Sequence, residues 1–308
     1  MAHYARSSGN LAADRRYDYA RHSAAEGDHA VAADLLMQTV ELAPSWPAAW
    51  FALGEAREAS GDATGAIAAF ERTALLDPEG SFGSTLRLAR LGAQASPASP
   101  PDAYVRDLFD QYAERFERHL LKGLAYRGPR ILAGTIDRAC LATGRPNRFG
   151  TAIDLGCGTG LAAQEIGPRC EVMDGVDLAP AMVALAKATG LYRKLEAAEM
   201  RAFLEDYADA TVDLVLAADV FVYLGDLEPL FAQVARVLCS GGMFGFTVQV
   251  ATGPEFNLGP DLRYTHSRVY LERLAHLHGW SIAALDEASI RQDRGIDVPG
   301  LALVMAAP

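Results

Sequence analysis

Hydrophobic and polar positions divide the chain into two parts with different patterns. In residues 14–91 the pattern predicts amphipathic helical hairpins, in which apolar positions recur every three or four residues. From residue 151 onward, short apolar runs alternate with stretches that favour helices, and several runs end in an acidic residue or a glycine turn. This alternation predicts an N-terminal all-α domain followed by an α/β domain with one central sheet.

The apolar runs of the second part predict the strands of that sheet. Five strands are expected at residues 151–155, 171–177, 194–198, 212–216 and 243–250, with helices at 161–166, 181–189 and 228–238. In the tail, residues 264–267 are expected to open a helix over 268–278. Two terminal strands are expected at 280–285 and 300–306, joined by the polar segment 286–299.

The N-terminal helices repeat with a period of 34 residues. Four pairs of matching positions have this separation: Gly27 and Gly61, Ala32 and Ala66, Leu36 and Phe70, and Pro44 and Pro78. The pattern resembles the tetratricopeptide repeat, a helix–turn–helix unit with a glycine in its turn and a small residue between its helices. Two repeats, and a third that ends near residue 91, favour either a docking surface for a protein partner or a structural, self-associating role.

A proline- and serine-rich stretch at residues 94–101 separates the two parts and is expected to be a linker. The sequence therefore predicts a repeat domain at 1–93 and a second domain at 102–308. A helix over residues 102–121, with aromatic residues at helical spacing, is expected to open the second domain.

The stretch at residues 152–161 joins the end of the first predicted strand to three glycines at alternate positions, Gly156, Gly158 and Gly160. A strand, a glycine turn and a helix in this order suit a ligand held against bare backbone at a helix N-terminus. A dinucleotide fingerprint is excluded because Leu161 stands where its third glycine should be. A phosphate-binding P-loop is excluded because no lysine is near. A tight structural turn without a ligand is the remaining alternative.

With Asp154 before the glycines, this stretch resembles motif I of the class I, Rossmann-like S-adenosylmethionine-dependent methyltransferases. The resemblance covers residues 102–308, and in combination with the repeats it is similar to bacterial tetratricopeptide-repeat-containing methyltransferases. It implies a seven-stranded Rossmann-like sheet and S-adenosyl-L-methionine as the cofactor. Backbone around the glycines is expected to hold the amino-acid part of the cofactor, and Asp154 is expected to face its ammonium group.

The resemblance also implies cofactor contacts at the ends of the next two strands. Asp177, 17 residues beyond Gly160, is expected to accept both ribose hydroxyls. Leu178 and Met182 are expected to flank the adenine, and Glu199 is expected to accept its amino group. The full set of expected cofactor-binding residues is Asp154, Gly156, Cys157, Gly158, Gly160, Asp177, Leu178, Met182, Glu199 and Met200.

The methyl acceptor is expected beyond the fourth strand. Asp219 and Tyr223 follow the run at 212–216, and ligands in such sheets bind beyond the carboxyl ends of the strands. Tyr112 lies on a helix that in the resembled methyltransferases folds over the cofactor, and His266 is a candidate base or substrate contact. A loop-forming role for Asp219 and a capping or surface position for His266 remain alternatives.

Composition limits the remaining choices. The chain has 308 residues, of which 50% are apolar, and a formal net charge of −11, which argues against nucleic acid as a partner. The charged start argues against a signal peptide, and no apolar run has membrane-spanning length. The four scattered cysteines fit reduced thiols in a cytoplasmic protein better than disulfides or a zinc site, and no metal is expected. The abundance of alanine and arginine favours a bacterial source.

These observations predict a methyltransferase that uses S-adenosyl-L-methionine to methylate an O or N nucleophile of a small molecule. Two alternatives remain open. One is a protein methyltransferase whose acceptor is recruited by the repeats, and the other is a non-catalytic cofactor-binding scaffold. The acceptor atom, the use of a general base and the oligomeric state are not fixed by the sequence.

Overall fold

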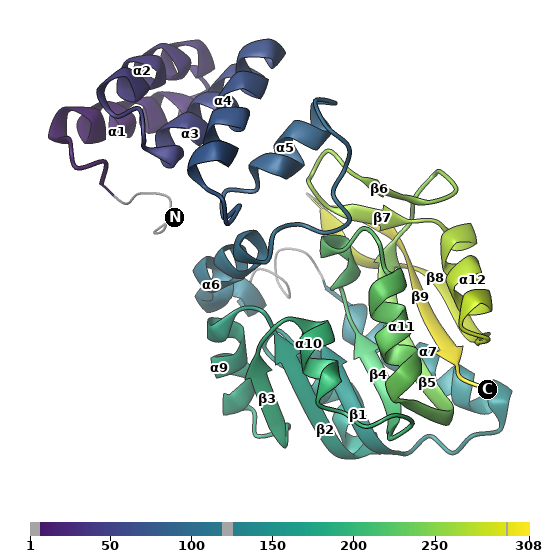
Figure 1. Cartoon of the computed structure of the whole chain (residues 1–308). Coiled ribbons are helices and arrows are strands. Elements are labelled where there is room, and N and C mark those ends of the chain that lie inside the picture. Colours follow the sequence, from purple (N-terminus) through teal and green to yellow (C-terminus); the bar gives the residue numbers. More distant parts are fainter. Residues whose placement is uncertain (1–6, 119–125, 294) are drawn as a thin grey trace. The chain divides into compact units, whose positions relative to one another are not determined.

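The computed structural model describes residues 7–118, 126–293 and 295–308 of the chain. The chain divides into two compact units, Met1–Asp107 and Leu108–Pro308. Figure 1 shows that the first is helical and that the second is built around a sheet. The finer division into residues 1–93, a linker at 94–101 and residues 102–308 stays a prediction.

The N-terminal unit consists of helical hairpins. Its helices are α1 (Leu11–Ala25), α2 (His29–Leu42), α3 (Pro47–Ala59), α4 (Ala63–Leu76) and α5 (Ser84–Arg90). Gly27 and Gly61 take left-handed φ values of 89° and 90° in the two turns, which a residue with a Cβ adopts at a cost. Ala32 and Ala66 are fully buried. The helical nature of this region is confirmed, whereas its identity as a tetratricopeptide array stays a prediction.

A cavity of about 370 Å³ lies within the N-terminal unit. Its charged side chains pair with one another: Arg87 donates to Glu55 at 2.9 Å and to Glu58 at 3.4 Å, and Arg90 also pairs with Glu58. The carboxylates of this cavity are therefore already engaged by arginines of the same unit.

The C-terminal unit contains a seven-stranded sheet with the order β3-β2-β1-β4-β5-β9-β8. Its strands are β1 (Phe149–Leu155), β2 (Cys170–Asp177), β3 (Lys194–Ala197), β4 (Val212–Ala217), β5 (Leu238–Gln249), β8 (Ser281–Asp293) and β9 (Ile296–Ala306). Strands β1 to β5 are parallel, and β9 runs antiparallel to both β5 and β8. The predicted Rossmann-like methyltransferase sheet is confirmed.

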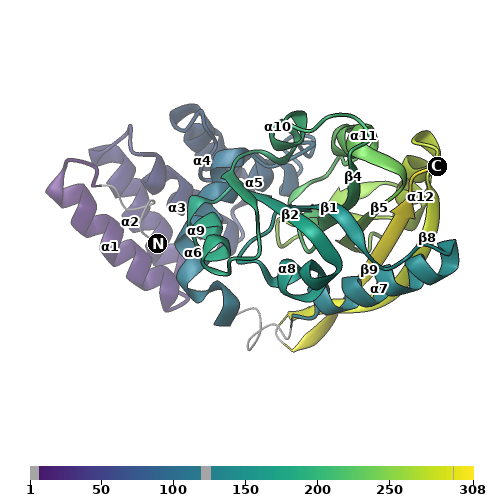
Figure 2. The same cartoon turned by 90° about the horizontal axis from the view of Figure 1, so that it is seen from below.

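Helices cover both faces of this sheet (Figure 2). On one face lie α7 (Gly128–Thr143) and α8 (Leu161–Ile166), and on the other lie α10 (Met200–Glu205), α11 (Glu228–Val237) and α12 (Arg268–Leu277). Buried apolar side chains pack between the helices and each face of the sheet, for example Ile136 of α7 on one face and Phe231 of α11 on the other. Because both faces are covered, the central strands β1 and β4 are mostly apolar, as the runs in the sequence indicate.

The terminal hairpin is longer than predicted. Residues 286–299, expected as a polar connection, instead extend β8 and β9, which pair up to Asp293 and Ile296. The polar residues of this segment satisfy one another across the hairpin, since Ser289 and Gln292 both donate to Asp297 Oδ1, at 3.1 and 3.0 Å. The predicted polar connection was wrong because polar side chains that pair across a hairpin do not produce an apolar run.

The predicted helix opening at 264–267 was also wrong. Residues Tyr264–His266 form strand β7, which pairs with β6 (Phe256–Leu258) in a two-stranded sheet. The following residue, Ser267, starts α12, because its hydroxyl accepts the Tyr270 N–H at 3.0 Å and donates to the Pro254 carbonyl at 2.8 Å.

Candidate active site

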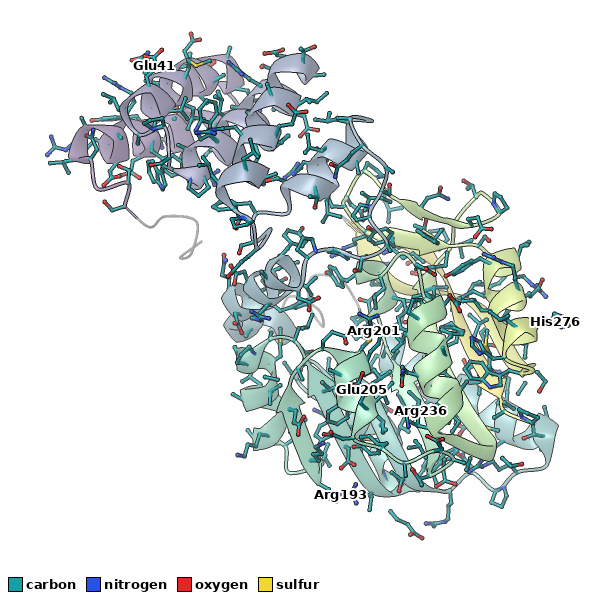
Figure 3. The ribbon with its side chains drawn as sticks, in the orientation of Figure 1. Glu41, Arg193, Arg201, Glu205, Arg236 and His276 are labelled. Carbon is teal, nitrogen blue, oxygen red and sulfur yellow. The ribbon has the colours of Figure 1, made fainter. Side chains whose placement is uncertain are left out.

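The candidate site lies at the carboxyl ends of the parallel strands, where the strand order reverses. Strand β1 is flanked by β2 on one side and β4 on the other, and such a switch point opens a crevice outside the sheet. Figure 3 marks the two ends of this sheet, with Arg193 just before β3 and Arg201 beyond its carboxyl end. The residues described below lie at the end that Arg201 marks.

The glycine turn after β1 exposes backbone at the start of α8. Gly156, Gly158 and Gly160 have φ values of 66°, 53° and 92°, all in the left-handed region that favours glycine. A Cβ on Gly156 would meet Val220 Cγ2 at 2.5 Å. Cys157 is buried, and its N–H donates to the Val176 carbonyl at 2.9 Å. The turn is thus tied to β2, and Gly156 has no room for a side chain.

Asp154 carries a buried carboxylate without a cationic partner among the described side chains. Its side chain accepts a 2.7 Å hydrogen bond from the Tyr192 hydroxyl, and the residue is 1% exposed. Burial raises the pKa of Asp154 to about 7; the Tyr192 bond opposes this rise and the neighbouring Asp177 adds to it. A bound ammonium group would compensate this charge, so Asp154 fits its predicted role.

Asp177 ends β2 with its carboxylate fixed by backbone. Oδ2 accepts the Gly158 N–H and Oδ1 accepts the Ala179 N–H, both at 2.9 Å. Burial raises the pKa of Asp177, and these two hydrogen bonds lower it. Each carboxylate oxygen can accept a further hydrogen bond, so the group suits a pair of hydroxyls such as those of a ribose.

The residues predicted beside the adenine have more varied surroundings. Leu178 is half-buried, and Met182, on α9 (Pro180–Ala188), is fully buried in a cluster with Ala113. A direct adenine contact by the Met182 side chain would therefore require this cluster to open. Glu199 caps α10, because its Oε2 accepts the N–H groups of Arg201 and Ala202 at 3.0 and 3.1 Å. Met200, the first residue of α10, is half-buried against the core.

Helix α6 (Asp102–Arg118) anchors one side of the site. Asp110 Oδ1 accepts the Ala181 N–H at 3.0 Å in the first turn of α9. The Phe109 ring meets the Tyr223 ring edge-on, with 5.2 Å between their centroids. Tyr112 is half-buried on the same helix. The rest of the predicted helix, residues 119–121, lies outside the described residues.

Asp219 lies beyond β4 in a strained backbone conformation, with a φ of 59°. Its N–H donates to Thr247 Oγ1 at 2.8 Å, and its Oδ2 lies 3.5 Å from Arg291 Nη1. Burial raises the pKa of Asp219, and Arg291 and Arg263 oppose this rise. Tyr223 lies beside it on the turn η3 (Phe221–Tyr223), and burial raises the pKa of its phenol. The structure therefore brings Asp219 and Tyr223 together.

His266 is placed differently from the expectation of an open helix start. It is fully buried in β7, and its Nε2 lies 2.9 Å from the Gly225 carbonyl oxygen. Burial lowers the pKa of this imidazole to about 4. A surface or capping position is therefore wrong for His266, and its partner is backbone of the loop after η3.

Four residues of the site escaped the sequence analysis, namely Tyr126, Tyr192, Arg263 and Arg291. Tyr192 bonds Asp154, and the pKa of the Tyr126 phenol is raised by burial and by both Asp219 and Asp154. None of them belongs to a motif at a strand end. Tyr126 lies just before α7 and Tyr192 between α9 and β3, whereas the two arginines lie in the β6–β7 and β8–β9 hairpins. Only the tertiary fold brings these segments together.

Across residues 7–118, 126–293 and 295–308, no group of three or more His, Cys, Asp or Glu side chains is placed to hold a metal ion. No helix within these ranges is long and apolar enough to cross a membrane.

Residues 153–246 match the model of a protein family described as a methyltransferase domain. This part of the chain is therefore similar to a methyltransferase domain. The chain is 32% identical over 114 residues to methyltransferase-like protein 27 from Homo sapiens, a match that covers 37% of this chain and 45% of that protein. It is 33% identical over 110 residues to the probable S-adenosylmethionine-dependent methyltransferase CRG1 from Saccharomyces cerevisiae, with 34% of this chain and 36% of that protein covered. The chain thus spans less than half the length of these relatives.

A solved structure shares the fold of the C-terminal unit. It is 1,6-didemethyltoxoflavin-N1-methyltransferase from Burkholderia thailandensis, solved with bound 1,6-didemethyltoxoflavin and S-adenosylhomocysteine. Its TM-score is 0.52 at 16% identity, and the match covers 70% of this chain and 93% of that one. The predicted resemblance to class I methyltransferases is confirmed, and S-adenosyl-L-methionine is the cofactor that these findings support.

Proposed function

We propose that the protein transfers a methyl group from S-adenosyl-L-methionine to an O or N nucleophile of a small molecule. The observation that carries this proposal is a pair of carboxylates beside the glycine turn, the buried Asp154 and the half-buried Asp177. Asp154 offers a carboxylate without a cationic partner among the described residues, and Asp177 offers a carboxylate that backbone N–H groups hold in place to accept hydroxyls. Both lie within the region that matches the methyltransferase domain family.

The proposed cofactor site extends along the ends of β1, β2 and β3. Asp154 holds the ammonium group, Asp177 holds the ribose hydroxyls, and the backbone around Gly156 and Gly158 contacts the amino-acid part. The further members are Cys157, Gly160, Leu178, Met182, Glu199 and Met200. When bound, the cofactor supplies an electrophilic methyl group on a sulfonium, and the protein supplies orientation and exclusion of water.

The proposed acceptor site lies beside Asp219. Because burial raises its pKa, this carboxylate is a better proton acceptor than an ordinary aspartate and suits a proton leaving a hydroxyl or amine. Thr247 fixes its backbone, and Tyr223 lies beside it; Tyr112, on the helix that carries Phe109, is proposed to face the acceptor. We do not assign His266 as the base, because it is fully buried and bonded to backbone.

A small acceptor fits the half-buried to buried side chains around Asp219 better than a protein surface does. The Burkholderia thailandensis relative acts on a small molecule by its name, which supports the same class here. In the cavity of the N-terminal unit, the carboxylates of Glu55 and Glu58 are already paired with Arg87 and Arg90. We place the enzyme in the cytoplasm, since its four cysteines are free thiols.

Transfer of a radiolabelled methyl group tests the proposal. The protein is incubated with labelled S-adenosyl-L-methionine and cell extract, and small molecules are then separated from proteins. We expect label in the small-molecule fraction, and none with an Asp177→Ala variant, whose cofactor binding is checked by calorimetry. Label in the protein fraction would instead support recruitment by the N-terminal repeats. Cofactor binding without any transfer would support a scaffold.

A further inference from the structure

Two arginines and one aspartate converge beside the proposed acceptor site. Asp219 follows β4, Arg263 lies between β6 and β7, and Arg291 belongs to β8. Both guanidinium groups act on the pKa of Asp219, which places them within electrostatic reach of its carboxylate. The charges of Asp219 and Asp154 both raise the pKa of the Tyr126 phenol, so this cluster adjoins the proposed cofactor site.

Arg291 is a buried cation with little compensation. The residue is 3% exposed, and among the described residues its side chain makes one hydrogen bond, to Asp219 Oδ2 at 3.5 Å. A charge-assisted bond between a guanidinium and a carboxylate normally measures about 2.7–2.9 Å and often uses two parallel N–H groups. The guanidinium therefore keeps most of its five donors for another partner.

A β-bulge delivers Arg291 to this position. The register of β8 against β9 shifts between Ser289 and Gln292, and within the shift both Ile290 and Arg291 are buried. A bulge re-aims a side chain that a regular strand would turn to the other face. Gly300 makes room for it, because a Cβ there would meet Ile290 Cγ1 at 2.8 Å.

Backbone contacts hold the bulge in place. The Arg127 N–H donates to the Ile290 carbonyl at 2.9 Å, which ties the segment before α7 to the bulge. This contact also explains the position of Tyr126, the neighbour of Arg127, beside Arg291. The burial of Arg291 is therefore built into the hairpin.

Arg263 approaches from a constrained turn. The preceding Leu262 has a φ of 61°, and the Gly259 N–H donates to the Arg263 carbonyl at 2.7 Å. The guanidinium carbon lies 6.0 Å from the centroid of the Tyr223 ring. Asp261 also acts on Arg263, but it is exposed to solvent, where its charge is screened.

We propose that the methyl acceptor carries an oxyanionic group, such as a carboxylate or a phosphate, which Arg291 and Arg263 bind while its nucleophile faces Asp219. This inference rests on the proposed function. The buried Arg291 and the half-buried Arg263 share the partly buried carboxylate of Asp219, and removing a cation from water without full compensation is costly. An oxyanion on the acceptor would compensate the positive charge of the two arginines, and the planar guanidinium group matches the geometry of a carboxylate or phosphate. The two arginines would then favour anionic acceptors over neutral ones.

The test follows the labelled product. The protein is incubated with labelled S-adenosyl-L-methionine and a deproteinised cell extract, and the products are separated on an anion exchanger at pH 7. We expect the label on retained, anionic products. Label on unretained products would overturn this inference and leave the proposed function standing. Absence of label from every fraction would overturn the proposed function itself.

Arginine variants test the contact directly. For the purified labelled acceptor, Arg291→Gln and Arg263→Gln should each raise KM about 10- to 100-fold, the usual effect of losing a charged hydrogen bond. Arg291→Lys, which keeps the positive charge, should raise KM less than Arg291→Gln does. The control is Arg268→Gln, which alters an exposed arginine paired with Glu272 at 2.7 Å. Calorimetric affinity for S-adenosylhomocysteine reports whether each variant is folded.

If the variants lower kcat with KM unchanged, Arg291 only positions Asp219, and the inference is overturned. Arg263→Gln keeps the inference testable should Arg291→Gln fail to fold, because Arg263 lies in a turn and is only half-buried.

Discussion

The two carboxylates beside the glycine turn differ in what compensates their charge. Asp177 accepts two backbone N–H groups, whereas Asp154 accepts one phenol O–H from Tyr192. Backbone donors fixed by the fold stabilise an ionised carboxylate strongly, and a single neutral hydroxyl does so less. Asp154 is therefore the residue whose protonation should respond to a cationic ligand.

We expect cofactor affinity to depend on pH through Asp154. Its pKa of about 7 in the free protein means that the carboxyl is largely protonated below pH 7. Binding an ammonium group requires the ionised form, so affinity for S-adenosylhomocysteine should fall about tenfold per pH unit between pH 7 and pH 5.5 and level off above pH 7. Calorimetry across this range measures the slope.

Two variants separate this effect from general changes with pH. Asp154→Asn should bind weakly and with most of the slope removed. Asp137→Asn, which alters a carboxylate paired with Arg169 at 2.6 Å on α7 away from the turn, should keep the wild-type slope. A flat affinity of the wild type from pH 5.5 to 8 would contradict the assignment.

Gly156 is the glycine whose replacement has the clearest consequence. Its φ of 66° strains any residue with a Cβ, and the added Cβ of Gly156→Ala would also meet Val220 at 2.5 Å. We expect a loss of about 1–3 kcal/mol in the free energy of unfolding, measured by urea titration, together with weaker cofactor binding. Gly167→Ala is the control, because Gly167 has a φ of −52° and open space at its Cβ position. Equal stability of the two variants would refute this account.

At the scale of elements, the bulge in β8 connects a feature of the backbone to the proposed specificity. Gly300 lies opposite the bulge, and a Cβ there would meet Ile290 Cγ1, the Val248 carbonyl and the Ala288 carbonyl at 2.8, 3.0 and 3.1 Å. The hairpin cannot absorb this volume without moving Ile290. Since Arg291 follows Ile290 directly, such a shift moves the guanidinium as well.

Gly300→Ala should therefore impair acceptor turnover more than cofactor binding. We expect overpacking to cost about 1–3 kcal/mol of stability and KM for the acceptor to rise, while affinity for S-adenosylhomocysteine stays at the wild-type value. Gly253→Ala, whose Cβ would meet only the Asn257 amide at 3.4 Å, should change neither. Loss of cofactor affinity in Gly300→Ala would show that the hairpin supports the whole domain rather than the acceptor side.

The elements also show why part of the site could be predicted and part could not. The buried parallel strands leave apolar runs, and Asp154, Asp177 and Asp219 lie at or just after the ends of these runs, so they could be found from the sequence. In the part of the hairpin that carries Arg291, residues 286–299, polar side chains pair across the strands, and this part lacks an apolar run. The convergence of Arg263 and Arg291 depends on packing between segments far apart in the chain.

At the scale of the whole molecule, the two units have separate cores. The core of the N-terminal unit includes Tyr17, Leu36 and Trp46, and no residue of this cluster belongs to the cores on the two faces of the sheet. Each unit therefore has its own apolar interior to stabilise it. The 34-residue period predicted the helical hairpins because it reports local packing, but it does not reveal what the helices bind.

Removal of residues 1–93 separates the small-molecule proposal from recruitment of a protein acceptor. This truncation keeps α6, including Asp110, whose bond to the Ala181 N–H anchors it on α9. With its core intact, the remaining chain should fold and bind S-adenosylhomocysteine with wild-type affinity, which calorimetry verifies first. If the acceptor is a small molecule bound beside Asp219, kcat and KM for the labelled acceptor should equal those of the full chain. If the repeats recruit the acceptor, transfer should be lost while cofactor affinity persists, and the small-molecule proposal would then be abandoned.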